Sequence, residues 1–209
     1  MGKQHKGIAD GFQGTVGPVV GYMWRGKWCL RSHPVYVRNP RTESQQSNRA
    51  RHAATVRLAS CLRPALRLGM HRCALERHLT ESNYFIQANR ASLQWDGEHL
   101  AVDHAALLLA DGPLPGVQFA EPRAESAHVV AVDYTTPAGE PMADDADLVY
   151  LAAWCPTMDA CRVAAPAFRS DGSVKIYLSR YWSGHPVWLY GWVQDSDGQS
   201  SPSRALGTL

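Results

Sequence analysis

Apolar and polar residues alternate in short runs through the C-terminal half of the chain, where clusters of Gly, Pro and Asp separate the runs. In one run Val174, Ile176 and Leu178 alternate with Lys175 and Tyr177, which is the two-residue period of a strand with one buried face. The seven β-prone runs are residues 117–120, 128–135, 148–154, 162–165, 174–178, 187–193 and 204–207. Seven short strands in about 95 residues predict an antiparallel β-sandwich of the immunoglobulin or fibronectin type, with a small barrel as the alternative.

The N-terminal third has a different pattern. Apolar runs on either side of the turn Arg25-Gly26-Lys27 predict a β-hairpin over about residues 15–32. A helix is expected to begin at Thr42 or Ser44, because either hydroxyl can cap its first turn. A buried stripe at helical spacing follows, made of Ala50, Ala54, Leu58, Cys61, Leu62 and Ala65. Pro64 must kink or restart this helix, and a second helical stretch is predicted over residues 71–89.

These elements predict an α+β protein of two domains. Residues 1–112 would form a Gly-rich arm, a β-hairpin and a helical region. Residues 113–209 would form the immunoglobulin- or fibronectin-like antiparallel β-sandwich.

The formal charge of +2 hides an uneven distribution of charge along the chain. Residues 1–78 hold fourteen Lys and Arg against three acids, whereas residues 79–209 hold seven against sixteen. A basic segment on an acidic body suggests contact with an anionic partner. The alternative is that the two halves pair with each other, within or between subunits. The cations expected to bind nucleic acid or another anion are Lys3, Lys6, Arg25, Lys27, Arg31, Arg38, Arg41, Arg49, Arg63 and Arg67.

Among these cations, Arg49, Arg63 and Arg67 are expected to share one exposed helical face. Eleven of the fourteen basic residues before residue 79 are arginine, which suits recognition of phosphate or carboxylate because the guanidinium donates two parallel hydrogen bonds.

The last long β-prone run is apolar on both faces. Trp188, Tyr190 and Trp192 share one face, opposite Leu189 and Val193. One face should fill the core, and the other should meet the N-terminal helices or another subunit. These three aromatic residues are therefore the predicted partner surface.

No pattern of residues supports catalysis or a cofactor. His71, Cys73, Glu76 and His78 lack the spacing of a metal-binding helix, and Cys155 and Cys161 have no CxxC partner, so we predict no metal at these positions. Asp103-His104 has no nucleophile motif to complete a triad. The sequence also has no apolar run long enough to span a membrane and no apolar signal segment, which predicts a cytoplasmic protein without membrane contact.

Two segments resemble an uncharacterised family, common in Bacteroidota and known only as a domain of unknown function. The first is GIADGFQGTVGPVVGYMWRGKWCLRSHP followed by NPRTESQQSNRARHA, and the second is DLVYLAAW through VWLYGWVQDSDGQSSPSRALG. The resemblance implies helices before a fibronectin-like sandwich, and it implies no activity.

The sequence therefore predicts a non-enzymatic structural or assembly protein that self-associates. Its basic N-terminal region would contact nucleic acid or another polyanion, and its β-sandwich would mediate packing between subunits. The alternative is an adhesion module that binds a glycan or a protein with its C-terminal aromatic face.

Overall fold

The fold was determined as a computed structural model, which describes residues 3–4, 12–24, 26–36, 41–140 and 142–209. The chain divides into two compact units, residues 1–45 and residues 46–209, called unit 1 and unit 2 below. This division differs from the predicted one at 112/113. Both units contain β-structure, and the α+β class is confirmed.

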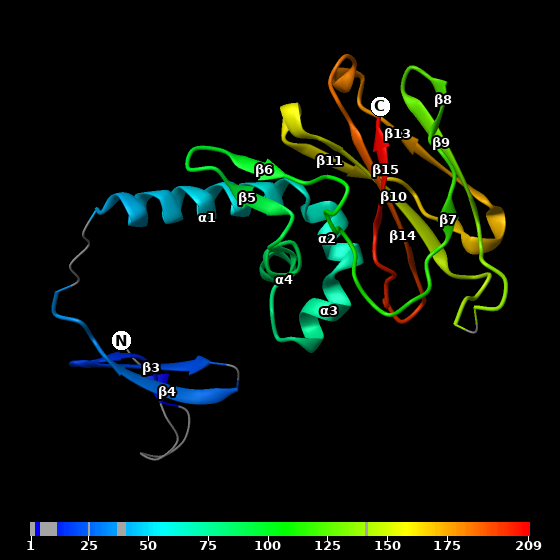
Figure 1. Cartoon of the computed structure of the whole chain (residues 1–209). Helices are drawn as coiled ribbons and strands as arrows, with labels where there is room; N and C mark the ends of the chain where they lie inside the picture. Colours follow the sequence, from blue (N-terminus) through cyan, green and yellow to red (C-terminus); the bar gives the residue numbers. More distant parts are fainter. Residues whose placement is uncertain (1–2, 5–11, 25, 37–40, 141) are drawn as a thin grey trace. The chain divides into compact units, whose positions relative to one another are not determined.

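Unit 1 contains an antiparallel sheet in the order β1-β2-β3-β4. Figure 1 labels two of these strands, β3 and β4. Its strands are β1 (Lys3–Gln4), β2 (Phe12–Val16), β3 (Val19–Trp24) and β4 (Lys27–Ser32). The predicted hairpin is present as β3 and β4, whose last pair is Trp24 with Lys27. Gly26 in the turn has a φ of 77°, a value that glycine adopts without strain. The predicted turn residue Arg25 lies outside the described residues.

Four helices follow the sheet. They are α1 (Glu43–Cys61), α2 (Arg63–Gly69), α3 (His71–Glu76) and α4 (Glu81–Ala88). Thr42 caps α1 as predicted, because its Oγ1 accepts a hydrogen bond from the backbone N–H of Gln45 at 3.4 Å. The helix restarts as predicted at Pro64, which lies in the first turn of α2, where its missing N–H costs nothing.

The helical stretch predicted over residues 71–89 is interrupted in the structure. It is two helices, because His78 takes a left-handed backbone conformation with a φ of 54°. Thr80 then starts α4, since its hydroxyl accepts a hydrogen bond from the N–H of Asn83 at 3.3 Å. An unpredicted hairpin follows, formed by β5 (Leu93–Trp95) and β6 (Leu100–Val102).

Two antiparallel sheets form the rest of unit 2. The first has the order β11-β10-β14-β15, with β12 also paired to β10, and the second has the order β13-β9-β7, with β8 also paired to β9. The strands of the first are β10 (Leu148–Cys155), β11 (Ala160–Val163), β12 (Ala167–Phe168), β14 (Trp188–Gln194) and β15 (Arg204–Thr208). Those of the second are β7 (Gln118–Phe119), β8 (Arg123–Ser126), β9 (Val129–Thr135) and β13 (Ser173–Tyr177).

Each of the seven predicted runs overlaps one of these strands. In the described part of the chain the last α-helix ends at Ala88, and three short 3₁₀ helices lie between strands. These are Pro156–Met158, Arg169–Asp171 and Arg180–Trp182.

Unit 2 has an apolar core on each side of the β10–β14 sheet. Leu189 and Val193 of β14 pack with residues of β9 and β13, which joins the two sheets. Tyr190 and Trp192, on the opposite face, pack with residues of α1, α2 and α4. The helical region and the sheets therefore share a core, which explains why the predicted domain boundary at 112/113 does not divide the structure.

Long-range hydrogen bonds join earlier segments of unit 2 to the last part of the chain. The Gln194 side-chain amide donates to the carbonyl oxygen of Leu68 at 2.8 Å, across 126 residues of sequence. The backbone N–H of Leu109 donates to the hydroxyl of Ser203 at 2.8 Å, across 94 residues.

Among the helices of the described residues, none is both long enough and apolar enough to cross a membrane.

Candidate anion-binding groove

The ten predicted anion-binding residues are distributed over both units. Lys6, Arg25 and Arg38 lie outside the described residues. Lys3 and Lys27 lie in the strands β1 and β4. Arg31 is on β4, with its guanidinium carbon 5.9 Å from the centre of the Tyr22 ring, and Arg41 precedes α1. Arg49, Arg63 and Arg67 belong to unit 2.

The three arginines of the predicted helical face are all exposed, but they lie on two helices. Arg49 is on α1, whereas Arg63 and Arg67 are on α2, because the helix restarts between Cys61 and Arg63. Arg63 and Arg67 line a hollow of about 510 Å³ next to Asp159. That carboxylate forms a salt bridge with Arg57. Among the described residues, neither Arg63 nor Arg67 has a carboxylate within salt-bridge distance, although the charge of Arg67 helps to lower the pKa of Glu81.

Two thiols also line this hollow. Burial raises the pKa of Cys161 to about 12, and burial together with the nearby Asp159 raises the pKa of Cys61. Both side chains are therefore protonated thiols at neutral pH, which are poor nucleophiles.

A larger groove lies between α1 and α4. Its volume is about 560 Å³, which is within the range of ligand-binding pockets. Its lining residues are Asn48, Arg51, His52, Thr55, Leu79, Asn83, Ile86, Gln87, Arg90 and Leu93. The aliphatic members are buried or half-buried and form the floor, whereas the polar members apart from Thr55 are exposed and form the rim.

Sequence spacing explains how the two helices build this groove. On α1, Asn48, Arg51 and Thr55 follow one another at intervals of three and four residues, so they lie on one face of the helix. The hydroxyl of Thr55 donates to the carbonyl oxygen of Arg51 at 2.8 Å, so this buried hydroxyl is satisfied within α1. The β5–β6 hairpin supplies Leu93 to the floor, and the Trp95 indole N–H fastens the hairpin to Ser47 of α1 at 3.1 Å.

The groove offers positive charge without neutralising carboxylates. No Asp or Glu lines it, and within the described residues neither Arg51 nor Arg90 has a carboxylate within salt-bridge distance. By contrast, Arg72 pairs with Glu76 at 3.1 Å. Unpaired guanidinium groups donate bidentate hydrogen bonds to a phosphate or carboxylate, so the groove can bind an anion.

Sequence reasoning did not identify Arg51 and Arg90 as site residues. Arg51 could have been found from its helical spacing to Asn48 and Thr55. Arg90 belongs to the net acidic part of the chain and reaches the groove only because α4 packs beside α1.

The predicted partner surface on β14 is covered by the chain itself, which corrects that prediction. Tyr190 and Trp192 are fully buried, and Trp188 is half-buried. The His104 ring stacks on Trp188 with 4.0 Å between ring centres, and the Tyr190 hydroxyl lies 3.4 Å from His104 Nδ1. The sequence predicted that the second face of this strand would meet either the N-terminal helices or another subunit, and it meets the helices. It is therefore not a free surface for a glycan or a partner.

Asp103 and His104 do not form a catalytic pair in the structure. The Asp103 carboxylate accepts hydrogen bonds from the backbone N–H groups of Ala105 and Ala106, which closes a turn. Burial against the tryptophans lowers the pKa of His104, while the charge of Asp103 opposes that shift.

The residues considered for metal binding are separated. His71 Nδ1 lies 2.7 Å from the Glu81 carboxylate, and the Cys73 thiol donates to the carbonyl oxygen of Asp111. Cys155 and Cys161 lie in different cores. Within the described ranges, no three His, Cys, Asp or Glu side chains form a cluster that could hold a metal ion.

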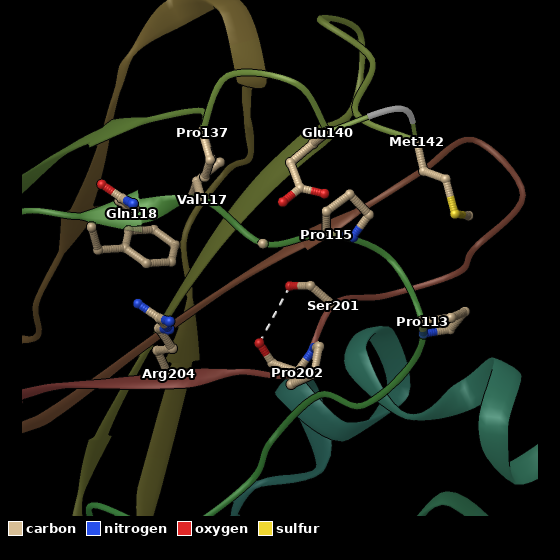
Figure 2. Close-up of a pocket in the computed structure, with 12 residues that line it drawn as sticks. Pro113, Pro115, Val117, Gln118, Pro137, Glu140, Met142, Ser201, Pro202 and Arg204 are labelled. Carbon is tan, nitrogen blue, oxygen red and sulfur yellow. Dashed lines mark hydrogen bonds between the residues drawn. The ribbon is translucent and has the colours of Figure 1, made fainter.

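Figure 2 shows a further pocket of about 520 Å³ in unit 2, between the segment 113–119 and the segment that leads into β15. Four prolines line it, together with Phe119, Glu140 and Arg204. Its two charged side chains have opposite signs, so it lacks the uniform positive charge of the α1–α4 groove.

Unit 2 thus defines a class of α+β protein in which helices cover one face of a pair of antiparallel sheets and carry a cation-rimmed groove. The chain belongs to a family of unknown function, DUF6266, whose model matches residues 11–207. No curated protein matches the sequence. Among solved structures, titin kinase with its flanking domains is similar over 45% of this chain and 16% of that chain, at 12% identity and a TM-score of 0.32.

Proposed function

We propose that this protein is a non-enzymatic binding protein whose arginine-rich helical layer holds nucleic acid through its phosphates. The observation that carries the proposal is a set of exposed arginines that form no salt bridge with the described residues: Arg51, Arg63, Arg67 and Arg90. Phosphate binding satisfies such groups and releases counterions, so affinity requires no reading of the base sequence.

We also propose that the two sheets of unit 2 form an immunoglobulin- or fibronectin-like sandwich. In the lettering of immunoglobulin domains, β7, β9 and β13 would be strands A, B and E of one sheet. The other sheet, in the order β11-β10-β14-β15, would then have the strand order C′-C-F-G. Sandwiches of this class divide their strands in the same way. The sandwich would be the body that presents the helical layer, while β8 and β12 are short additions to it.

The experiment is the salt dependence of binding to a labelled DNA duplex, measured by fluorescence anisotropy. Four phosphate contacts predict a slope of about −3.6 in a plot of log K against log salt, which is a loss of about 150-fold between 50 and 200 mM. Any contacts from the basic residues of unit 1 would add to this slope.

The test variant replaces Arg51, Arg63, Arg67 and Arg90 with Gln, which keeps length and polarity but removes charge. We expect weaker binding at low salt and a slope flattened by about 3.6. The control is Arg123→Gln with Arg180→Gln, which removes two charges outside the helical layer, where Arg123 already pairs with Asp133 and Arg180 lies over the Tyr181 ring. Equal losses per removed charge in the two variants, or no binding by the wild type at 50 mM salt, would contradict the proposal.

A further inference from the structure

The sheet of unit 1 carries a patch of exposed apolar side chains. The register pairs Met23 with Trp28 and Gly21 with Leu30, which puts these side chains on one face of the β3–β4 hairpin. The exposed fractions are 44% for Met23, 40% for Trp28 and 63% for Leu30. We call these three residues the sheet patch.

The face that holds the sheet patch carries no charge among its described side chains. The register adds Val16, Val19 and Ser32 to this face. Arg31 lies on the opposite face, where its guanidinium approaches the Tyr22 ring. The two faces therefore differ: one is apolar and neutral, and the other is aromatic and cationic.

The described part of unit 1 buries very little. Of its described residues only Gly21 is buried, where a side chain would overlap the carbonyl oxygen of Phe12. A unit of 45 residues has too little core to be stable alone, and a small sheet needs an apolar face covered by something else. The sheet patch is the surface available for this purpose.

We propose that the sheet patch packs against the sheet patch of a second copy of this chain. Unit 1 is strongly basic, with seven Lys and Arg against two acids, so contact through its cationic face would bring like charges together. Contact through the neutral face avoids that repulsion. The same face offers a polyanion or an acidic protein nothing to pair with.

A second copy also offers the surface that matches. Outside unit 1, the large exposed apolar side chains with described positions are spread over unit 2, such as Val56 on α1, Leu75 on α3 and Tyr177 on β13. Isolated apolar side chains of this kind are ordinary on a protein surface, whereas a cluster on neighbouring strands marks an interface. A patch that packs against the same patch of a second chain gives a two-fold symmetric dimer.

Three side chains bury less area than a standard interface, so we expect a dissociation constant on the order of micromolar. The experiment measures the mass of the full chain by analytical ultracentrifugation from about 1 to 100 µM, a range that brackets this value. A wild type that stays monomeric throughout would overturn the proposal and would mean that the patch is covered within one chain or by another partner.

Leu30→Lys places a charge in the patch, and we expect it to raise the dissociation constant at least about tenfold, as the loss of an interface hot spot does. The matched control is Thr15→Lys, which adds the same charge at an exposed position on the opposite face and should leave the dimer intact. Dimers that survive Leu30→Lys, or dissociate equally in both variants, would overturn the proposal.

A mixing experiment separates a lost interface from a lost fold. Leu30→Lys and Leu30→Glu chains should each be monomeric, and an equimolar mixture should recover a dimer containing one chain of each kind. A mixture that stays monomeric would show that the two patches do not face each other.

Discussion

Strands β14 and β3 are both apolar on two faces, but they meet different surroundings. Both faces of β14 are covered within unit 2, by the second sheet on one side and by the helices on the other. The β3–β4 hairpin has large side chains on both faces, and Met23, Trp24, Trp28 and Leu30 remain exposed by 40% or more. A strand with two apolar faces needs two covering layers, and unit 1 does not contain them among its described residues.

The largest expected effect is a difference in unfolding free energy between two tryptophan variants, one on β14 and one on β4. Trp192→Ala empties a fully buried site on β14 and should cost about 3–5 kcal/mol of unfolding free energy. Trp28→Ala removes a 40% exposed ring from β4 and should cost about 0.5 kcal/mol or less at concentrations where the chain is monomeric. Urea unfolding followed by far-UV circular dichroism measures both. Similar losses in the two variants would mean that β4 is covered as completely as β14.

The second effect concerns a buried ion pair in unit 2. Arg169 Nη2 lies 3.0 Å from the Asp147 carboxylate, with side-chain exposures of 1% and 6%. The same Nη2 atom donates to the carbonyl oxygen of Pro115 at 2.8 Å. Arg169→Met leaves the Asp147 charge buried without its partner and should cost about 3 kcal/mol.

The double variant Arg169→Met with Asp147→Asn is the control for that charge. It should be more stable than Arg169→Met alone, because no uncompensated carboxylate remains buried. If both variants unfold at the same urea concentration, the loss comes from packing and not from charge.

The smallest effect tests how tightly the aromatic face of β14 is covered. Burial lowers the pKa of His104, so the folded state binds fewer protons than the unfolded chain near the ordinary histidine pKa of 6.5. His104 therefore contributes stability above pH 6.5 that is lost as the pH falls towards its lower folded pKa. The melting temperature should fall between pH 7.5 and 5.5, and His104→Gln should flatten that fall. An unchanged pH profile in the variant would place the titration elsewhere.

The strands of unit 2 were predictable because their side chains alternate and Gly, Pro and Asp separate them. β8 was missed because all four of its residues are exposed, so it has no apolar signal, and β12 has only two residues. The domain boundary was wrong because it followed the change of charge. Charge describes the surface, whereas the shared core of Leu58, Leu62, Tyr190 and Trp192 decides which parts of the chain fold together.

The candidate groove was less predictable than the fold. Helical periodicity places Arg51 on a face of α1 but does not show that α4 lies beside it. Arg90 is distant from Arg51 in the sequence, and the two residues line one groove only in the folded chain. The neutral face of the unit 1 sheet could be traced from the hairpin register, since the turn at Gly26 decides which residues pair.

The hydrogen bond from Gln194 to Leu68 has a consequence for the order of events during synthesis. The helices leave the ribosome before the strand that covers their apolar stripe, and 126 residues separate the two ends of this contact. At translation rates of about 5–20 residues per second, roughly 6–25 s pass between the synthesis of Leu68 and that of Gln194. For that interval the nascent chain exposes arginine-bearing helices without the sheet that covers their apolar side chains, and a chaperone that binds such segments would find them there.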